Sequence, residues 1–401
     1  MEKLFERHDQ YLAEIPTKFV RGVIYKIDWS LRLIAIKGPK GVGKSTLMLQ
    51  YIKLNFSVDD RHVLYCSADT NYFTTHTLVD TADKFCKIGG RYLFIDEIHK
   101  YENWSREIKE IYDLHRELHI VISGSSLLQI NDGHSDLSRR LTEYQMSGLS
   151  FREFMCMMTG VNIEPIELSS LLNSPNLFCQ EVKRHFHPLE YFHLYLKEGY
   201  YPFYFENKKM YHNVIENVIN YIVDNELTMF RGLEVGNSRR IKALLQVLSK
   251  MVPYEVDISK LSRTIGIQRP TTLKYLKNLE EAALIRRLFT KIDTITDLQK
   301  PDKILIDNSN ILYTLSDSNP EIGTVRETFF CNQLCAAGHI VEYGGLKTGD
   351  FRIDKEIVIE VGGSDKGLKQ IQNEEYGYVA ADDIDNAIFR KIPLGAFGYL
   401  Y

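Results

Sequence analysis

The chain has 401 residues, of which 44% are hydrophobic and 25% charged, and a formal net charge of -4. The length exceeds one ordinary core and predicts two to three domains, while the balance excludes a disordered or fibrous protein. The slightly negative charge excludes a chain that is basic throughout, so any contact with nucleic acid must come from a local patch.

Two features indicate the compartment. The N-terminal segment MEKLFERHDQYLAEIP carries charges throughout, and no apolar run is long enough to cross a bilayer. The six cysteines are scattered without a CxxC pair, which predicts reduced thiols rather than a disulfide framework. We therefore expect a cytoplasmic protein that does not contact membranes.

The first motif is GPKGVGKS at residues 38–45, between an apolar stretch that predicts a buried strand and a segment with helical periodicity. In GxxxxGK[ST] the glycines let backbone N–H groups wrap phosphates, the lysine reaches the outer phosphates and the hydroxyl binds magnesium. The motif therefore predicts that ATP and Mg²⁺ bind here, with Ser45 as a metal ligand. The predicted contacts are Gly38, Pro39, Lys40, Gly41, Val42, Gly43, Lys44, Ser45 and Thr46.

A second acidic motif follows in RYLFIDEIHK, where an apolar strand, residues 92–95, ends in Asp96 and Glu97. Asp96 is expected to hold Mg²⁺ through water. Glu97 is the predicted catalytic residue that polarises the water attacking the γ-phosphate. The alternative is a pair of carboxylates that simply face solvent at a strand end.

Residues 62–69 and 118–126 predict two further strands, and a fifth is expected near 145–150. Strands that alternate with helices form a parallel sheet, whose site lies at the carboxyl ends of the strands. Ser125 ends one of these strands and is a candidate for a side chain between the magnesium site and the attacking water. The alternative is an ordinary hydroxyl at a strand end.

Together these segments resemble a known family. IKGPKGVGKSTLMLQYIK, YLFIDEIHKYENWSREIKEIYD, VISGSSLL and GLSFREF are similar to AAA-type ATPases of bacteria and archaea that carry an appended domain of the restriction-endonuclease shape. The resemblance continues in YLKEGYYPFY, LKYLKNLEEAALIRRL and KPDKILIDNSNILY, and covers nearly the whole chain. It implies an α/β fold class: a P-loop NTPase with a parallel sheet (1–155), a helical lid (156–245), a winged helix (246–315) and a C-terminal α/β restriction-endonuclease-like domain (316–401).

The resemblance also implies roles for single residues. The family's nucleotide lysine falls on Lys44, its magnesium ligands on Ser45 and Asp96, its catalytic glutamate on Glu97 and its sensor on Ser125. The arginine that precedes SFREF matches Arg140, which implies an arginine finger toward the γ-phosphate of its own or a neighbouring subunit. Arg139 stands where the family has glycine, so either arginine fits, and a surface pair is the alternative. A finger that acts in trans implies a homo-oligomer.

Residues 258–288 predict a helix, a turn at Gly266, a helix opened by Pro270 and a strand, the order of a helix-turn-helix with a wing. From 258 to 290 there are seven Lys or Arg and two Glu, a net charge of +5. Such a helix can bind DNA phosphates through Arg269, Lys274 and Lys277, with Thr271 or Thr272 at a base edge. A surface for partner proteins is the alternative.

In the C-terminal segment, Glu327, Asp350 and Glu360 match the acidic positions of active nucleases of this shape, but the lysine position is Gly362. Without that cation nuclease activity is not expected, unless Lys366 or Lys369 folds back to replace it. We expect an inactive domain that binds DNA ends or a partner protein. The sequence thus predicts a Mg²⁺-dependent ATPase whose turnover rearranges the winged-helix and C-terminal domains. The alternative is a DNA-binding regulatory or defence switch that hydrolyses ATP rarely.

Overall fold

The computed structural model describes the chain except residues 127–136, 138, 232–234, 251–255, 291–299 and 346–347. The chain divides into two compact units, residues 1–147 and 148–401. Within the described residues no helix is both long and apolar enough to span a membrane.

The first unit is built on a parallel sheet of five strands in the order β2-β3-β4-β1-β5. This confirms the predicted α/β fold class, although the fifth strand starts three residues before the expected 145–150. Its strands are β1 (Leu33–Lys37), β2 (Val63–Ser67), β3 (Tyr92–Asp96), β4 (His119–Gly124) and β5 (Thr142–Gln145). Its helices are α1 (Glu2–Glu14), α2 (Lys44–Asn55), α3 (Leu78–Lys87) and α4 (Trp104–Leu114), with 3-10 turns η1 (Gly22–Tyr25), η2 (Asn71–Thr74) and η3 (Ile98–Lys100).

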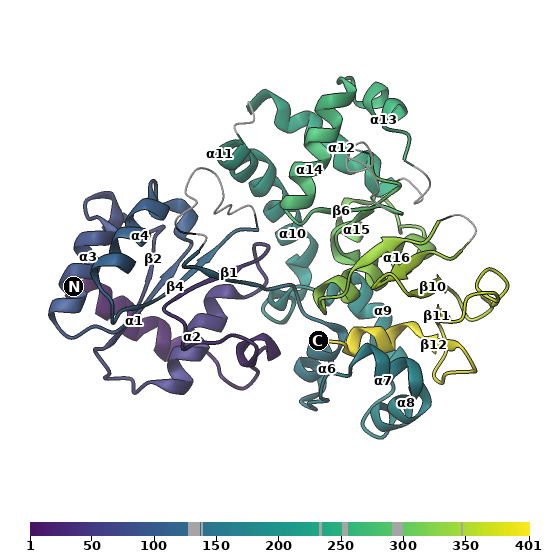
Figure 1. Cartoon of the computed structure of the whole chain (residues 1–401), viewed down its shortest axis with the longest axis horizontal. Coiled ribbons are helices and arrows are strands. Elements are labelled where there is room, and N and C mark those ends of the chain that lie inside the picture. The colour runs from purple at the N-terminus through teal and green to yellow at the C-terminus, as the bar shows by residue number, and fades with distance from the viewer. Residues whose placement is uncertain (127–136, 138, 232–234, 251–255, 291–299, 346–347) are drawn as a thin grey trace. The chain divides into compact units, whose positions relative to one another are not determined.

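Helices cover both faces of this sheet. Figure 1 shows α1 and α2 on one side of it and α3 and α4 on the other. All five residues of β1 are buried, as is expected of a strand that helices cover on both faces. This burial explains why β1 is a continuous apolar run, whereas the edge strand β5 is polar and largely exposed.

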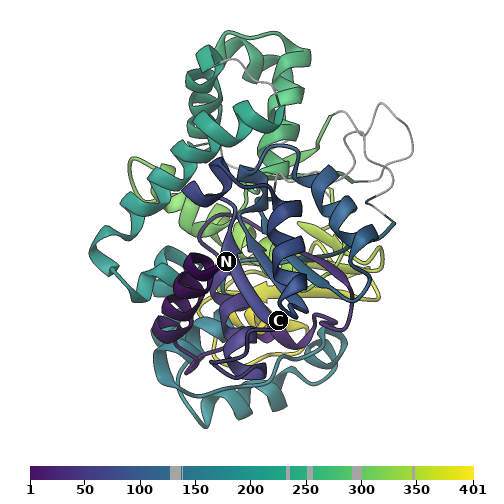
Figure 2. The same cartoon turned by 90° about the vertical axis from the view of Figure 1, so that its left-hand side faces the viewer.

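A buried histidine joins α1 to the edge strand β2. Figure 2 shows α1 as the purple helix beside the N-terminal mark. Nδ1 of His8 accepts a hydrogen bond of 3.0 Å from the backbone N–H of Tyr65, and the histidine is 1% exposed. Helix α1 thus satisfies a backbone group that an edge strand would otherwise leave unpaired.

The second unit begins with helices. They are α6 (Phe151–Thr159), α7 (Leu168–Asn173), α8 (Pro175–Lys183), α9 (Leu189–Glu198), α10 (Tyr211–Tyr221), α11 (Leu227–Arg231) and α12 (Ser238–Lys250), with short turns η4 (Pro202–Phe205), η5 (Lys208–Met210), η6 (Ile222–Glu226) and η7 (Val235–Asn237). A capping box formed by Ser150 and Glu153 starts α6. The Ser150 hydroxyl and Arg152 Nε both donate to the carbonyl of Tyr401, each at 2.8 Å, so the last residue packs on the first helix of this unit.

Two helices and a strand pair come next along the chain. Helix α13 (Ile258–Ile265) ends at Gly266, whose φ of 67° reverses the chain into α14 (Arg269–Glu281). Strands β6 (Ile285–Leu288) and β7 (Lys303–Ile306) pair antiparallel. These are the helix, turn, helix and strand that the sequence predicts, and in Figure 1 they lie in the green part of the chain.

The C-terminal part holds a second sheet, with the order β12-β11-β10-β9-β8. Its strands are β8 (Val341–Tyr343), β9 (Phe351–Ile353), β10 (Ile357–Gly362), β11 (Gly377–Ala381) and β12 (Lys391–Pro393). Strand β10 runs parallel to β11 and antiparallel to β9. Helices α15 (Ser309–Leu315) and α16 (Ile322–Ala336) precede the sheet, α16 packs against β10, and the turn η9 (Leu394–Tyr399) follows it.

The environment of His8 predicts a loss of stability in acid. Burial lowers the pKa of His8 from 6.5 to about 4. The unfolded chain therefore binds a proton at a higher pH than the folded one, so this stability is complete above pH 6.5 and is lost as the pH falls toward 4. The loss should reach about 3 kcal/mol.

Thermal unfolding of wild type and His8→Asn across this pH range tests the prediction. Asparagine keeps an acceptor for the Tyr65 amide but does not titrate, so the variant should lose less of its unfolding free energy between pH 6.5 and pH 4. Equal losses in both proteins would contradict the assignment to His8.

Candidate active site

Three glycines shape the loop between β1 and α2, for two different steric reasons. Gly41 and Gly43 have φ of 87° and 97°, in the left-handed region that favours glycine. A Cβ on Gly38 would lie 2.2 Å from the carbonyl oxygen of Met146, the residue after β5. Side chains at positions 38, 41 and 43 would disturb this loop conformation, and the glycines leave the loop backbone accessible to a ligand.

Lys44 starts α2 and turns back over this loop. Its Nζ donates to the carbonyls of Gly38 and Pro39 at 2.9 and 3.0 Å, and the residue is 6% exposed. The ammonium group and the N-terminus of a 12-residue helix thus face the same loop. This combination of a cation and the backbone N–H groups of a helix N-terminus suits phosphate.

Arg21 also holds this loop, and sequence reasoning missed it. Its guanidinium donates to the carbonyl of Val42 at 3.2 Å and to that of Ser147 at 3.1 Å, and it is buried. The residue lies just before η1, far from the motif in the sequence. No pattern around Arg21 distinguishes it from a surface arginine.

Asp96 lies at the carboxyl edge of the sheet, between the ends of β2 and β4. Because β3 runs between β2 and β4, its last residue receives donors from both neighbours. The Tyr65 hydroxyl of β2 donates to Oδ2 at 2.7 Å, and the Ser123 hydroxyl of β4 donates to Oδ1. The backbone N–H of Glu97 also donates to Oδ1, at 3.0 Å. Asp96 is 4% exposed, so these contacts hold a buried carboxylate in one orientation.

Glu97 follows in a left-handed conformation, with φ of 51° and ψ of 40°. This region is unfavourable for a residue with a Cβ, and such strain is common at functional sites. The backbone N–H of Glu97 reaches the Ser123 hydroxyl at 3.1 Å, and the side chain is 25% exposed. The turn therefore aims the Glu97 carboxylate away from the strand while Asp96 stays buried.

The structure brings Ser125 to this edge, but a different serine contacts the acidic pair. Ser123 is fully buried and binds both Asp96 and Glu97, whereas the backbone N–H of Ser125 donates to His99 Nδ1 at 3.4 Å. Sequence reasoning chose the serine at the strand end. It missed Ser123 because strand alternation alone does not say which side chain faces β3.

Arg140 lies at the amino-terminal edge of the sheet, where the strands begin, opposite to the carboxyl edge that carries the phosphate loop. Its guanidinium pairs with Asp113 near the end of α4, at 3.1 and 3.3 Å, and it precedes β5. Thr142 of β5 aligns with Ile34, at the start of β1, whereas the phosphate loop follows the end of β1. A strand of five residues separates these edges by about 16 Å. Arg140 therefore does not reach the phosphate loop of its own unit. Its neighbour Arg139 is exposed.

Some of the residues predicted to contact DNA are exposed on α14, and one is buried. Arg269, Lys274 and Lys277 are exposed on α14. Thr272 is fully buried and its hydroxyl bonds Ser262 at 2.8 Å, so the prediction that it contacts a base edge is wrong. Helix periodicity places position 272 on the face that packs against α13.

Salt bridges occupy several of the cations that the sequence predicts for this segment. Arg286 pairs with Asp307 at 3.0 Å and Arg287 with Glu280 at 2.6 Å. Lys277 lies 3.8 Å from Glu281, one helical turn away. Arg269 and Lys274 are therefore the main exposed cations of the predicted DNA-binding surface.

The three predicted acidic residues of the C-terminal part lie around one site. Lys366 Nζ is 2.5 Å from Glu360 on β10, and Lys303 Nζ of β7 is 2.7 Å from Glu327 on α16. Asp350 accepts the backbone N–H of Val361 at 2.8 Å. Lys303 links the strand pair to α16, which the sequence does not indicate.

The protonation of this acidic site reflects burial. Burial raises the pKa of Glu327 to about 7, with the Lys303 ammonium opposing and the Asp350 carboxylate adding to the shift. Burial also raises the pKa of Glu360, again with help from Asp350. The hydrogen bond and charge of Glu360 outweigh burial and raise the pKa of Lys366. The carboxylates thus repel one another enough to favour a proton or a further cation.

Lys366 also fills the space of the missing lysine. A Cβ on Gly362 would lie 2.8 Å from three carbons of the Lys366 side chain. The side chain of Lys366 therefore passes over Gly362 to reach Glu360. Lys369, the other residue that the sequence offered for this role, is exposed.

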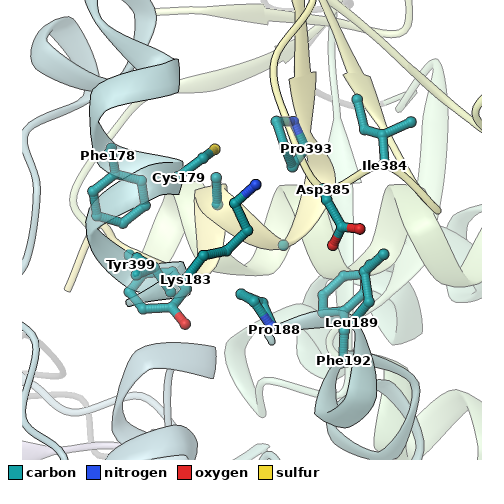
Figure 3. Close-up of a pocket in the computed structure, with 13 residues that line it drawn as sticks. Phe178, Cys179, Lys183, Pro188, Leu189, Phe192, Ile384, Asp385, Pro393 and Tyr399 are labelled. Carbon is teal, nitrogen blue, oxygen red and sulfur yellow. The ribbon is translucent and has the colours of Figure 1, made fainter. Parts of the chain in front are cut away.

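Two other features of the second unit lack the chemistry of a site. His193 lies 3.2 Å from Asp383 and near Asp382, but Arg326 pairs with both carboxylates, at 2.8 Å for Asp382 and 3.3 Å for Asp383. A mostly apolar pocket of about 30 Å³ lies where α8, α9 and the segments around β12 meet, as Figure 3 shows. That volume is close to one water molecule, too small for an organic ligand.

Comparison with known proteins bears on the first unit. A family model described as an AAA domain matches residues 30–155. Residues 30–155, most of which lie in the first unit, are thus similar to an AAA domain and contain the phosphate loop. A second model, described as a domain of unknown function (DUF8612), matches residues 189–321. A search of curated proteins finds no match.

Two solved structures are similar over part of the chain. The structure of C. elegans PCH-2 is 18% identical, with a TM-score of 0.25, over 44% of this chain and 48% of that chain. A structure that describes katanin self-assembly is 14% identical, with a TM-score of 0.25, over 40% of this chain and 57% of that chain. This chain therefore spans about half the length of either protein.

The tight approach at Gly38 predicts a specific steric effect. In Gly38→Ala the new Cβ would meet a backbone oxygen, so either β5 or the loop must shift, at about 1–3 kcal/mol of folding stability. We expect a lower Tm and weaker binding of a fluorescent ATP analogue. Gly236→Ala is the matched control, because no described atom lies within 4 Å of its Cβ position. An ATP affinity and Tm like those of wild type in Gly38→Ala would contradict this account.

Proposed function

We propose that this protein binds and hydrolyses ATP with Mg²⁺ and couples the turnover to a rearrangement of its second unit. The observation that carries the proposal is the cross-strand contact of the Asp96 carboxylate with the Ser123 hydroxyl. That contact lies at the edge of the sheet from which the phosphate loop starts. A carboxylate held at this edge, next to Glu97, has the position that metal-assisted phosphoryl transfer requires.

Ser45 and Asp96 are the residues that would hold Mg²⁺. The donors that reach Asp96 within the described residues are a phenol, a serine hydroxyl and a backbone amide. All three donors are uncharged, so they leave the negative charge of Asp96 in place. A carboxylate that keeps its charge is a suitable ligand for a divalent cation. When bound, the metal supplies charge stabilisation for the phosphate oxygens.

The chain's own residues would perform the remaining steps. Lys44 and the backbone N–H groups of residues 40–46 bind the phosphates, and Ser125 lies at the same edge as the proposed sensor. Glu97 takes a proton from the attacking water. Because Arg140 lies at the opposite edge of the sheet, its proposed role as a finger requires a neighbouring copy of the chain, and hence a homo-oligomer.

The second unit would convert turnover into a change of binding. We propose that α13, α14 and the strand pair form a winged helix whose Arg269 and Lys274, with Lys277 beside them, contact DNA phosphates. A protein partner on the same surface is the alternative. A chain that binds ATP and hydrolyses it rarely would instead be a DNA-binding regulatory or defence switch.

Phosphate release by the full chain with Mg²⁺ and ATP tests the proposal. Wild type should turn over, and the rate per chain should rise with protein concentration if Arg140 acts in trans. Glu97→Gln should bind ATP with unchanged affinity and lose at least about 100-fold in rate, the range expected for a general base. Double-stranded DNA should raise the wild-type rate, and an Arg269→Ala, Lys274→Ala variant should lose that increase only.

Each outcome distinguishes the alternatives. A rate of phosphate release that does not change when DNA is added would favour a protein partner for α14. ATP binding without turnover would favour the switch and would show that the role given to Glu97 is wrong.

A second candidate function is phosphodiester hydrolysis by the C-terminal part, which the sequence did not favour. One observation supports it: Lys366 lies over Gly362 and contacts Glu360, so the cation that the sequence lacked is supplied from another position. In this function Glu327, Asp350 and Glu360 would hold a divalent cation. Water would add to phosphorus while the bond to the leaving oxygen breaks.

Cleavage of a labelled DNA duplex by the full chain with Mg²⁺ or Mn²⁺ tests this candidate. Lys366→Ala and Glu360→Gln should each abolish any cleavage, whereas Lys369→Ala, the exposed neighbour, should keep it. If wild type does not cleave the duplex, with or without ATP, the nuclease candidate is wrong. The role that the sequence predicts, binding of DNA ends or a partner protein, would then stand.

A further inference from the structure

A buried histidine lies between Glu97 and the end of β4. His99, in η3, is 1% exposed. Its Nε2 is 3.4 Å from Glu97 Oε2, and its Nδ1 accepts the backbone N–H of Ser125 at 3.4 Å. The ring thus lies between the proposed base on one strand and the backbone of the neighbouring strand, with Nε2 at an ion-pair distance from the carboxylate rather than in hydrogen-bond geometry.

These two contacts determine the tautomer of His99. A backbone N–H can only donate, so Nδ1 carries a lone pair and the single ring proton of the neutral form lies on Nε2. Burial lowers the pKa of His99 to about 3, and the nearby charges of Lys100, Lys44 and Lys40 add to this shift. The neutral ring therefore presents an N–H donor to the Glu97 carboxylate at neutral pH.

We propose that His99 is a positioning residue, which holds Oε2 of Glu97 through Nε2–H and so directs the other carboxylate oxygen toward the attacking water. The role rests on the proposed ATPase function. It explains why a histidine is buried beside a strained turn. It also explains how the partly exposed Glu97 side chain keeps one orientation, because His99 lies between it and the end of β4.

The chain contains a matched control. His8 is also 1% exposed, its Nδ1 also accepts a backbone N–H, and burial lowers its pKa to about 4. It lies on α1 and makes no contact with Glu97 among the described hydrogen bonds and ion pairs. His8→Phe therefore reproduces the structural effect of losing a buried histidine without the proposed effect on Glu97.

The experiment compares His99→Phe, His99→Gln and His8→Phe in the full chain. His99→Phe should keep ATP affinity within about twofold and lower kcat by about 10- to 100-fold, the range seen when a partner that orients a functional ligand is removed. His99→Gln keeps an N–H donor toward Glu97 and should recover most of this loss. His8→Phe should lower Tm to a similar extent while its kcat stays at the wild-type value.

Several outcomes would overturn the role of His99. These are an unchanged or raised kcat in His99→Phe, an equal loss in both His99 variants, or a loss of kcat in His8→Phe that matches its loss of Tm. In Glu97→Gln, adding His99→Phe should change single-turnover hydrolysis no further, and a further decrease would indicate a merely structural role.

A second readout does not depend on turnover. Nitrogen NMR of wild type should show a neutral His99 with its proton on Nε2, and the Nε2 signal should shift in Glu97→Gln. Absence of this tautomer would overturn the contact itself. A wild type without any turnover, but with this tautomer, would instead overturn the proposed ATPase function and the positioning role that rests on it, and would leave the contact as a structural one.

Discussion

The buried carboxylate of Asp96 is the group on which the rest of the active site depends. It ends β3, and the strands on both sides contribute a hydroxyl to it, Tyr65 from β2 and Ser123 from β4. These contacts exist only if the sheet has the order β2-β3-β4, because a hydrogen bond cannot reach across an intervening strand. The sheet order therefore determines the orientation of the proposed metal ligand. In turn, the Ser123 hydroxyl supports the strained turn by accepting a hydrogen bond from the backbone N–H of Glu97.

The phosphate loop depends on the same sheet in another way. Strand β1 lies between β4 and β5, and the residue after β5 approaches Gly38 so closely that no side chain fits there. Arg21 closes the other side of the loop by binding the carbonyls of Val42 and Ser147. The loop is thus held in its shape by the protein before any phosphate arrives, which lowers the ordering entropy that binding must overcome.

Sequence patterns predicted β1 to β4 of the first sheet, α2 and the residues of the phosphate loop, because each is a local feature with its own spacing, whereas β5 lies earlier in the chain than expected. They also placed Asp96 and Glu97 at one strand end. What they missed are contacts between segments: Arg21 with the loop, Ser123 with Asp96 and His99 with Glu97. The error at Thr272 has the same origin, since its burial depends on packing against α13. A residue's neighbours in space follow from sheet order and helix packing, which local periodicity does not contain.

Lys366 shows the same limit most clearly. Read by position, the C-terminal part lacks the lysine of an active site, because Gly362 stands in its place. In the structure, that glycine leaves the space through which the Lys366 side chain reaches Glu360, and a Cβ at position 362 would obstruct it. Glycine at position 362 therefore makes room for the Lys366 ammonium to reach the site. A comparison of sequence positions counts Gly362 as the loss of a lysine, but in the structure Lys366 supplies a cation near Glu327, Asp350 and Glu360.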